Sequence, residues 1–310
     1  MKNDQFKIAV SSLSFSKNEK LRTRLSSISD NIQFNETGSI LNEAQLIEFV
    51  KDIDILILGT EKLTEKVLSK ASRLKLISKY GVGLDNIDFD ACEKLGIEVR
   101  HRQGVNKLAV AEMTLGFMLS LCRNLYKSSV DLKQGRWLKN GGTQLSGKTV
   151  GIIGVGHIGK EVVRLLQPFG CRILVNDIVE QGDYYNANEL TYVDKDTLFS
   201  ESDIVTIHTD LNKETRFMID SSVFDKMKTS AFFINTARGE LVLQLDLKTA
   251  LLNNIISGAA VDVYETEPVS DLDLLSLSNF YCTPHIGGNS IEAVQSMGKA
   301  AIDNLVEFLN

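Results

Sequence analysis

The 310-residue sequence contains little proline, cysteine or tryptophan, with 3, 4 and 1 of these residues respectively. The cysteines are far apart and include no C-x-x-C pair, which argues against a zinc site or a disulfide framework and favours a reducing compartment. No apolar run approaches the ~20 residues that a membrane span requires. The N-terminal segment MKNDQFKIAVSS also lacks the apolar core of a signal peptide. We therefore expect a cytoplasmic globular protein with no bound metal and no membrane partner.

The sequence also lacks any basic run, and its net charge is −6. A nucleic-acid partner is therefore not expected, because such proteins gather Lys and Arg on one face. At this length the chain can form two domains of ordinary size, each with its own core.

Residues 149–159, TVGIIGVGHIG, are the most informative segment. An apolar run leads into Gly154, Gly156 and Gly159 at G-x-G-x-x-G spacing, a helical pattern follows, and a second apolar run ends at Asp177. This is the order and span of one βαβ unit. Gly154 would allow a tight turn, Gly156 would let the backbone approach a pyrophosphate, and Gly159 would let the helix pack closely on the strand. The N-terminus of the helix also favours phosphate binding. Asp177 would bind a ribose diol and repel a ribose phosphate, so the segment predicts binding of NAD rather than NADP.

Short apolar runs alternate with amphipathic segments along both halves of the chain. This alternation predicts an α/β protein with parallel sheets. The expected strands are residues 6–10, 54–58, 74–78, 97–99, 150–153, 173–175, 203–208, 231–235, 258–263 and 280–283. The clearest helix is Asn42–Lys51, and a final helix over 290–309 is expected to cross back onto the first domain.

Residues 106–132 read as one unusually apolar helix, LAVAEMTLGFMLSLCRNLY at its centre. A helix that is apolar on most sides must be buried between domains or between subunits. We therefore expect a homodimer.

Three further strand ends carry polar residues, where open α/β sheets bind ligands. Arg238 follows one strand in FFINTARGE, beside the small-residue turn Thr236-Ala237, and could bind a carboxylate through two parallel hydrogen bonds. The second strand end, in AAVDVYETEP, carries three acidic residues. The third, in FYCTPHIGG, carries His285. A histidine paired with a carboxylate keeps a proton available for a carbonyl oxygen. The acids that could pair with it are Asp262, Glu265 and Glu267.

The chain resembles the D-isomer-specific 2-hydroxyacid dehydrogenases over nearly its whole length. The matching motifs, in order, are YGVGLDNID, QGVN with AVAE, LSGKTVGIIGVGHIG, NTARGE, DVYETEP and TPHIGG. The resemblance implies two doubly wound parallel-sheet domains with a substrate cleft between them. These would be a flavodoxin-like substrate domain, residues 1–102 and 286–310, and a Rossmann NAD-binding domain, residues 103–285. It also implies a short, phosphoglycerate dehydrogenase-like form without a regulatory domain.

The resemblance also assigns roles to single residues. Arg238 would bind the substrate's carboxylate and carbonyl oxygen, His285 would be the general acid/base, and Glu267 would raise the pKa of His285. Backbone N–H groups of Val82 and Gly83 would bind the substrate carboxylate. The expected NAD contacts are Gly154, Gly156, His157, Ile158, Gly159, Asp177, His208, Thr236, Ala237, Asp262 and Gly287.

The sequence departs from the family pattern at several points. Gln103 replaces a proline of the family's P-G-x-N motif. The family usually has a proline two residues after the histidine at position 208, whereas this chain has Thr209-Asp210 there. Leu58-Gly59 stands where phosphoglycerate dehydrogenases often carry an Arg-Ser turn. Lys79 and Arg102 could still supply positive charge at the substrate turns, which favours a small 2-keto acid with a second anionic group, such as phosphohydroxypyruvate.

Three alternative functions remain at this point. One is an NAD-sensing corepressor of the same fold, although the chain shows no extra interaction segments. A formate dehydrogenase would pair the histidine with glutamine instead of Glu267. A methyltransferase would have no use for the Arg238, Glu267 and His285 set.

Overall fold

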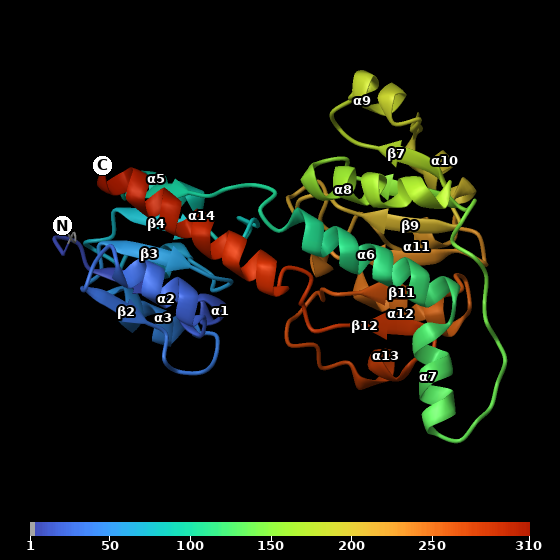
Figure 1. Cartoon of the computed structure of the whole chain (residues 1–310), viewed down its shortest axis with the longest axis horizontal. Helices are drawn as coiled ribbons and strands as arrows, with labels where there is room; N and C mark the ends of the chain where they lie inside the picture. Colours follow the sequence, from blue (N-terminus) through green and yellow to red (C-terminus); the bar gives the residue numbers. More distant parts are fainter. Residues whose placement is uncertain (1–3) are drawn as a thin grey trace. The chain divides into compact units, whose positions relative to one another are not determined.

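The computed structural model describes residues 4–310, which form two compact units. Unit 1 consists of residues up to Asn106 together with Gly288–Asn310, and unit 2 is Lys107–Gly287. These divisions fall at residues 106 and 287, against the expected boundaries at 102 and 285. Figure 1 shows both units coloured along the sequence.

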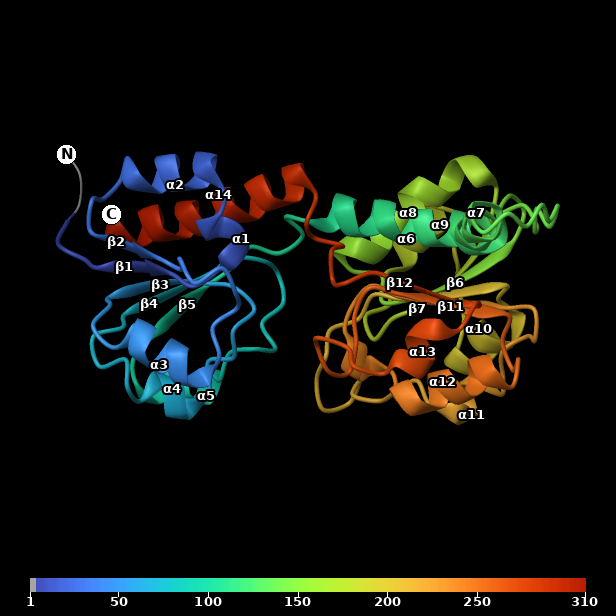
Figure 2. The same ribbon diagram turned by 90° about the horizontal axis from the view of Figure 1, so that it is seen from below.

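Unit 1 is a five-stranded parallel sheet in the order β2-β1-β3-β4-β5, the flavodoxin-like arrangement. Its strands are β1 (Ile8–Val10), β2 (Ile32–Phe34), β3 (Ile55–Leu58), β4 (Leu76–Lys79) and β5 (Glu98–Arg100). Its helices are α1 (Leu13–Ser16), α2 (Glu19–Ser26), α3 (Glu43–Val50), α4 (Glu65–Leu68), α5 (Phe89–Lys94) and α14 (Ile291–Leu309). In Figure 2 α1, α2 and α14 cover one face of the sheet and α3, α4 and α5 cover the other.

The final helix packs on unit 1, as its amphipathic pattern predicts. Met297, Ala301 and Leu305 join Ile8, Val10 and other residues of the sheet in one buried apolar cluster. The hydroxyl of Ser78 in β4 donates to the carbonyl of Ala301 at 2.7 Å. Unit 1 is therefore assembled from two segments of chain that the whole of unit 2 separates.

Unit 2 is a seven-stranded parallel sheet in the order β12-β11-β10-β9-β6-β7-β8. Its strands are β6 (Thr149–Ile153), β7 (Arg172–Asn176), β8 (Thr191–Tyr192), β9 (Ile204–Ile207), β10 (Phe232–Asn235), β11 (Gly258–Val261) and β12 (Phe280–Cys282). Its helices are α6 (Lys107–Cys122), α7 (Leu125–Lys133), α8 (His157–Leu166), α9 (Gly182–Ala187), α10 (Lys195–Glu201), α11 (Ser221–Phe224), α12 (Gln244–Leu252) and α13 (Leu272–Ser276), with 3₁₀ turns at Gln167–Phe169 and Gly239–Leu241.

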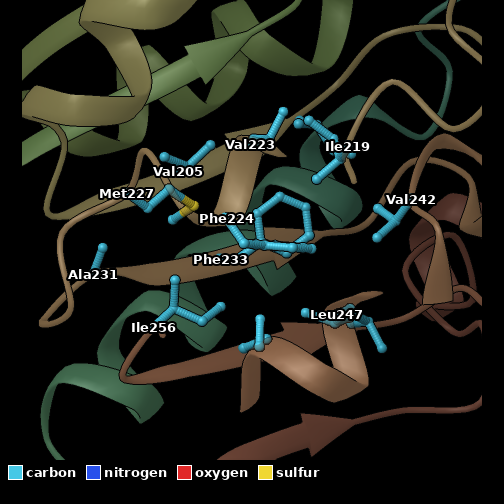
Figure 3. Packing of buried hydrophobic residues seen from close by; sticks show 14 of the residues in the cluster. Val205, Ile219, Val223, Phe224, Met227, Ala231, Phe233, Val242, Leu247 and Ile256 are labelled. Atoms are coloured by element: carbon cyan, nitrogen blue, oxygen red, sulfur yellow. The ribbon is translucent and has the colours of Figure 1, made fainter. Parts of the chain in front are cut away.

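Two buried clusters lie on opposite faces of this sheet. One packs α6 and α8 against the strands, and the other packs α10 to α13. Phe224 and Phe233 meet edge to face in the second cluster, with ring centroids 5.5 Å apart (Figure 3). These apolar cores hold the strand ends that carry the candidate functional residues.

The expected single helix over 106–132 is wrong, because it is broken between α6 and α7. Asn124 adopts a left-handed φ of 50°, a conformation that asparagine tolerates. The segment returning from α7 also occupies the end of α6, where the Thr143 N–H donates to the Cys122 carbonyl at 2.7 Å. In the described residues no single helix could span a membrane; α6 and α7 together have the length and composition, but they are bent by 61°.

Candidate active site

The parallel register of unit 2 places five strand ends in one row. Ile153 pairs with Ile207, which pairs with Asn235, which pairs with Val261, which pairs with Cys282. The residues that follow these positions therefore come to the same carboxyl edge of the sheet. They are Gly154, His208, Thr236, Asp262 and Thr283. The strand order reverses at β6, the switch point at which open α/β sheets bind nucleotides.

The three glycines of the turn after β6 differ in their surroundings. Gly154 has a φ of +89°, and a Cβ there would lie 2.6 Å from the His208 carbonyl oxygen. A Cβ on Gly159 would lie 2.1 Å from the carbonyl oxygen of Gly154, so this glycine lets α8 approach the turn. Gly156 caps α8 and faces open space, with nothing within 4 Å of its Cβ position. The open position at a helix N-terminus is suited to a pyrophosphate.

The carboxylate of Asp177 follows β7 and faces the same turn. Its Oδ2 accepts a hydrogen bond from the Val155 N–H at 2.6 Å, and its Oδ1 accepts one from the Val179 N–H at 2.9 Å. The side-chain amide of Gln181 donates to the Val155 carbonyl at 3.2 Å, so the backbone N–H and the backbone carbonyl of Val155 are both hydrogen-bonded. A carboxylate can accept further hydrogen bonds, which leaves capacity for a ribose diol.

His208 and Thr236 stand on neighbouring strands of this edge. Part of His208 reaches the surface, but its Nδ1 is buried without a hydrogen-bond partner, and Nε2 lies 3.0 Å from the Thr206 hydroxyl. Burial lowers the pKa of His208 to about 3, so the ring is neutral. Thr236 is bonded through its hydroxyl to Thr114 of α6 at 2.9 Å.

The remaining cofactor candidates lie at the start of α8 and in the adjoining turns. His157 and Ile158 form the first turn of α8, with His157 exposed. Ala237 is buried, and its N–H donates to the Asn235 side chain at 3.0 Å. The glycine turn, Asp177 and the unpartnered nitrogen of His208 therefore provide features into which a dinucleotide fits.

His285 and Glu267 form a hydrogen-bonded pair. His285 Nδ1 lies 2.7 Å from Glu267 Oε2, and the side chains remain 39% and 37% exposed. Because a carboxylate only accepts, Nδ1 carries the hydrogen in this contact. The hydrogen bond to Glu267 raises the pKa of His285 against the opposing effect of burial. Burial opposes ionisation of Glu267, but His285, the Tyr264 N–H and the charge of Arg238 together lower its pKa.

A buried aspartate shapes the turn that carries His285. Asp262, 1% exposed, accepts hydrogen bonds from the Thr283 hydroxyl at 2.6 Å, the Ile286 N–H at 2.8 Å and the Gly287 N–H at 2.7 Å. These donors bracket His285, whose φ of 52° is unusual for a residue with a Cβ. The expected cofactor contacts Asp262 and Gly287 are therefore bonded to each other.

Arg238 follows β10 in a turn that is fixed from two sides. The Asn235 side chain donates to the Arg238 carbonyl at 2.8 Å, and one guanidinium nitrogen donates to the Ala237 carbonyl at 2.7 Å. A Cβ on Gly239 would lie 1.9 Å from the Tyr264 carbonyl carbon, so its absence allows this turn to touch the segment leading to Glu267.

Tyr264 links the segment that carries Glu267 to the turn that carries His285. Its N–H donates to Glu267 Oε1 at 3.1 Å, and its hydroxyl donates to the Thr283 carbonyl at 3.0 Å. The positions of Tyr264, Asn235 and Gly239 in this arrangement could not be predicted from local sequence patterns alone. For Asn235 the sequence does offer a signal, because a polar residue ends the apolar run Ala231–Ile234.

The proposed substrate residues of unit 1 lie around the end of β4. Val82 and Gly83 stand in the turn after β4, half-buried, with Gly81 at a φ of 108°. The Lys79 ammonium donates to the Gly59 carbonyl and to Asn86 Oδ1. Arg102 forms an ion pair with Glu307 of α14. Both cations are thus engaged inside unit 1, which weighs against their serving as the second-anion site that the sequence favoured.

A glycine turn suited to a nucleotide, on the same sheet edge as an acid–histidine pair and an arginine, is typical of a dinucleotide-dependent dehydrogenase. Residues 115–287 match the family described as "D-isomer specific 2-hydroxyacid dehydrogenase, NAD binding domain". The chain is 34% identical over 279 residues to a hydroxypyruvate reductase of Thermotoga maritima, covering 88% of this chain and 90% of that one. It is 39% identical over 274 residues to a glyoxylate reductase of Thermofilum pendens, covering 86% and 81%.

A solved structure shares the whole fold. The phosphoglycerate oxidoreductase of Vibrio cholerae superposes with a TM-score of 0.84 at 31% identity, over 98% of this chain and 99% of that one. The chain belongs to the D-isomer-specific 2-hydroxyacid dehydrogenase family. It is an NAD-dependent oxidoreductase, and the expected fold class, family and cofactor are confirmed.

The pairing of Glu267 with His285 predicts a shift in the pH profile. Replacing Glu267 with glutamine removes the hydrogen bond to a carboxylate that raises the pKa of His285. With His285 as the expected general acid, reduction of a 2-keto acid requires its protonated form and declines as pH rises through that pKa. In Glu267→Gln this decline should therefore begin at a lower pH, as measured by kcat/KM against pH. Glu265→Gln, which changes an exposed neighbour, should leave the profile in place; an unshifted profile in Glu267→Gln contradicts the pair.

Proposed function

We propose that this protein interconverts a 2-keto acid and the D-2-hydroxy acid, with Arg238, Glu267 and His285 as the catalytic residues. The observation that carries the proposal is the hydrogen-bonded pair of His285 and Glu267 on the same sheet edge as the glycine turn and Asp177. When bound, NADH supplies hydride to the carbonyl carbon of the substrate.

The chain's own residues supply the proton and the orientation. Arg238 binds the substrate carboxylate and places the carbonyl oxygen near His285. Glu267 holds Nδ1–H, so that Nε2–H of protonated His285 donates to the carbonyl oxygen as charge develops there. In the reverse direction neutral His285 takes the hydroxyl proton. The N–H groups of Val82 and Gly83 are proposed to bind the substrate carboxylate as well.

The proposed NAD contacts divide the cofactor among the strand ends. Gly154, Gly156, Gly159, His157 and Ile158 would hold the pyrophosphate, and Asp177 the adenosine ribose. His208, Thr236, Ala237, Asp262 and Gly287 would line the rest of the site.

The relatives include a hydroxypyruvate reductase, a glyoxylate reductase and a D-3-phosphoglycerate dehydrogenase, so two classes of substrate stay open for this protein. One is a small 2-keto acid with an uncharged tail, and the other is a dianion such as phosphohydroxypyruvate. The contacts of Lys79 and Arg102 favour the first class. Purified protein should oxidise NADH with at least one member of a panel of glyoxylate, pyruvate, hydroxypyruvate, phosphohydroxypyruvate and oxaloacetate. Absence of turnover on the whole panel would overturn the proposed activity.

Asp177 predicts the choice between the two nicotinamide cofactors. In Asp177→Ser the ribose diol loses an acceptor and a ribose phosphate loses a repelling charge. The KM for NADH should rise and that for NADPH should fall, each by about tenfold, the effect of one hydrogen bond to a charged group. Asp183→Ser, on α9, serves as the control for a lost surface charge. A native preference for NADPH would contradict the assignment.

A homodimer formed through α7 is proposed for the assembly. The apolar face of α6 packs inside unit 2 against α8, whereas Leu125, Tyr126 and Leu132 of α7 are more than half exposed. Trp137, 75% exposed, and Leu138 extend this apolar set into the following segment. Figure 1 shows α7 projecting from the end of α6. Exposed apolar groups gathered in this way mark association surfaces.

The dimer has a direct test in solution. Native protein at micromolar concentration should sediment as a dimer, and Trp137→Glu combined with Leu138→Glu should sediment as a monomer. Leu245→Glu, which changes an exposed leucine elsewhere in unit 2, should remain dimeric. A native monomer would disprove this assembly.

We also propose a cytoplasmic location, because all four cysteines are free thiols.

A further inference from the structure

A buried carboxylate lies at the carboxyl edge of the sheet in unit 1. Glu61, shortly after β3, is 3% exposed. Its Oε2 accepts hydrogen bonds from the Ser11 hydroxyl at 2.8 Å and from the Gly59 N–H at 3.1 Å. Ser11 follows β1, so the carboxylate joins the ends of two adjacent strands. The catalytic steps described above make no use of this group.

The ammonium of Lys79 lies on the other side of Gly59. Lys79 is 5% exposed, and its Nζ donates to the Gly59 carbonyl at 2.5 Å and to Asn86 Oδ1 at 2.8 Å. The Asn86 amide donates in turn to the carbonyls of Gly59 at 3.1 Å and Glu61 at 2.7 Å. Both polar groups of Gly59 are therefore bound, the N–H by an anion and the C=O by a cation.

Glycine is required at position 59 for this arrangement. A Cβ there would lie 2.9 Å from Ser12 Cα and 2.9 Å from Glu61 Oε2. Contacts under 3.0 Å with backbone do not occur without displacement, so any side chain would separate the ends of β1 and β3 or expel the carboxylate. Glycine at position 59 thus keeps the Glu61 carboxylate next to the hydrogen bonds that join Lys79, Asn86 and the Gly59 carbonyl.

We propose that Glu61 is a specificity-determining residue that offsets the charge of Lys79, so that the enzyme favours 2-keto acids with an uncharged tail over those with a second anionic group. This inference rests on the proposed function. The Val82–Gly83 turn follows Lys79 by only a few residues. Asn86, a few residues further on, is hydrogen-bonded to the Lys79 ammonium and to the Glu61 carbonyl. Charges removed from water are screened less than surface charges, so the sign of the net charge at this edge affects an anionic tail.

The test compares two substrates that differ by one phosphate group. In native protein kcat/KM for hydroxypyruvate should exceed that for phosphohydroxypyruvate. In Glu61→Gln, which keeps the shape and one acceptor oxygen, the ratio of phosphohydroxypyruvate to hydroxypyruvate should rise about tenfold, the change produced by one partly screened charge. Glu65→Gln, an exposed carboxylate on α4, should leave the ratio unchanged.

Several outcomes separate this proposal from a structural role and from the proposed function itself. If Glu61 only stabilises the fold, both substrates lose activity together and the ratio stays constant, which overturns the proposal. A native preference for phosphohydroxypyruvate overturns it without any variant, so the test holds even if Glu61→Gln fails to fold. Loss of the proposed function would instead appear as no NADH oxidation with either substrate.

Discussion

Replacing His285 with alanine should lower kcat for 2-keto acid reduction by between about a hundredfold and ten-thousandfold, the range that a general acid contributes. Glu267 holds the imidazole at 2.7 Å. In the proposed mechanism this ring carries the proton that the carbonyl oxygen needs. NADH affinity, measured by fluorescence titration, should stay near that of the native protein. Retention of more than about a third of kcat would show that another group donates the proton.

The backbone at position 285 calls for a second variant. His285 has a φ of 52°, which costs alanine more than asparagine because asparagine adopts this conformation more readily. His285→Asn should therefore keep the turn held by Asp262 while losing the acid. Equal losses of kcat in both variants, with native NADH binding, would assign the effect to the imidazole and not to the shape of the turn.

Gly239→Ala should reduce both activity and stability. The new Cβ would lie 1.9 Å from the Tyr264 carbonyl carbon and 2.0 Å from its oxygen, and backbone atoms cannot yield as a flexible side chain does. The Arg238 turn must then move away from the segment that holds Glu267. A displacement of about 1 Å at a catalytic group costs on the order of a hundredfold in rate, and overpacking costs about 1–3 kcal/mol in free energy of unfolding.

The matched control for this variant is Gly182→Ala at the start of α9. Nothing lies within 4 Å of its Cβ position, so it tests the effect of a Gly-to-Ala change without the steric conflict. Activity and urea denaturation should be near native in Gly182→Ala. Near-native kcat/KM in Gly239→Ala would mean that contact between the two turns does not position Arg238.

Much of unit 2 could be predicted from the sequence because each feature had a local cause. The apolar runs bounded by Gly, Asp and His marked β6, β7 and β9, and the spacing of Gly154, Gly156 and Gly159 marked the turn. Two short strands escaped notice. β2 (Ile32–Phe34) and β8 (Thr191–Tyr192) are edge strands with polar residues, so their pattern is weak.

The features that were missed depend on contacts between distant segments. The break after Cys122 requires the segment around Thr143 to return to it, and no local pattern near Cys122 indicates this. Tyr264 looked like one more apolar residue of a motif, although its two hydrogen bonds connect the turns of Glu267 and Thr283. The sequence marked Lys79 as a candidate substrate residue and gave no sign of Glu61. The burial of both side chains could not be predicted, because it arises only when β1, β3 and β4 are aligned.

The two-segment construction of unit 1 imposes an order on synthesis. Ribosomes release β1 to β5 first, while the helix that covers their Ile8 and Val10 face is encoded beyond the whole of unit 2. Unit 2 is continuous and can complete its own core as it emerges. Until α14 leaves the ribosome, this face of the nascent sheet is covered only by α1 and α2, and the apolar surface that α14 will bury stays exposed and prone to aggregation during that interval.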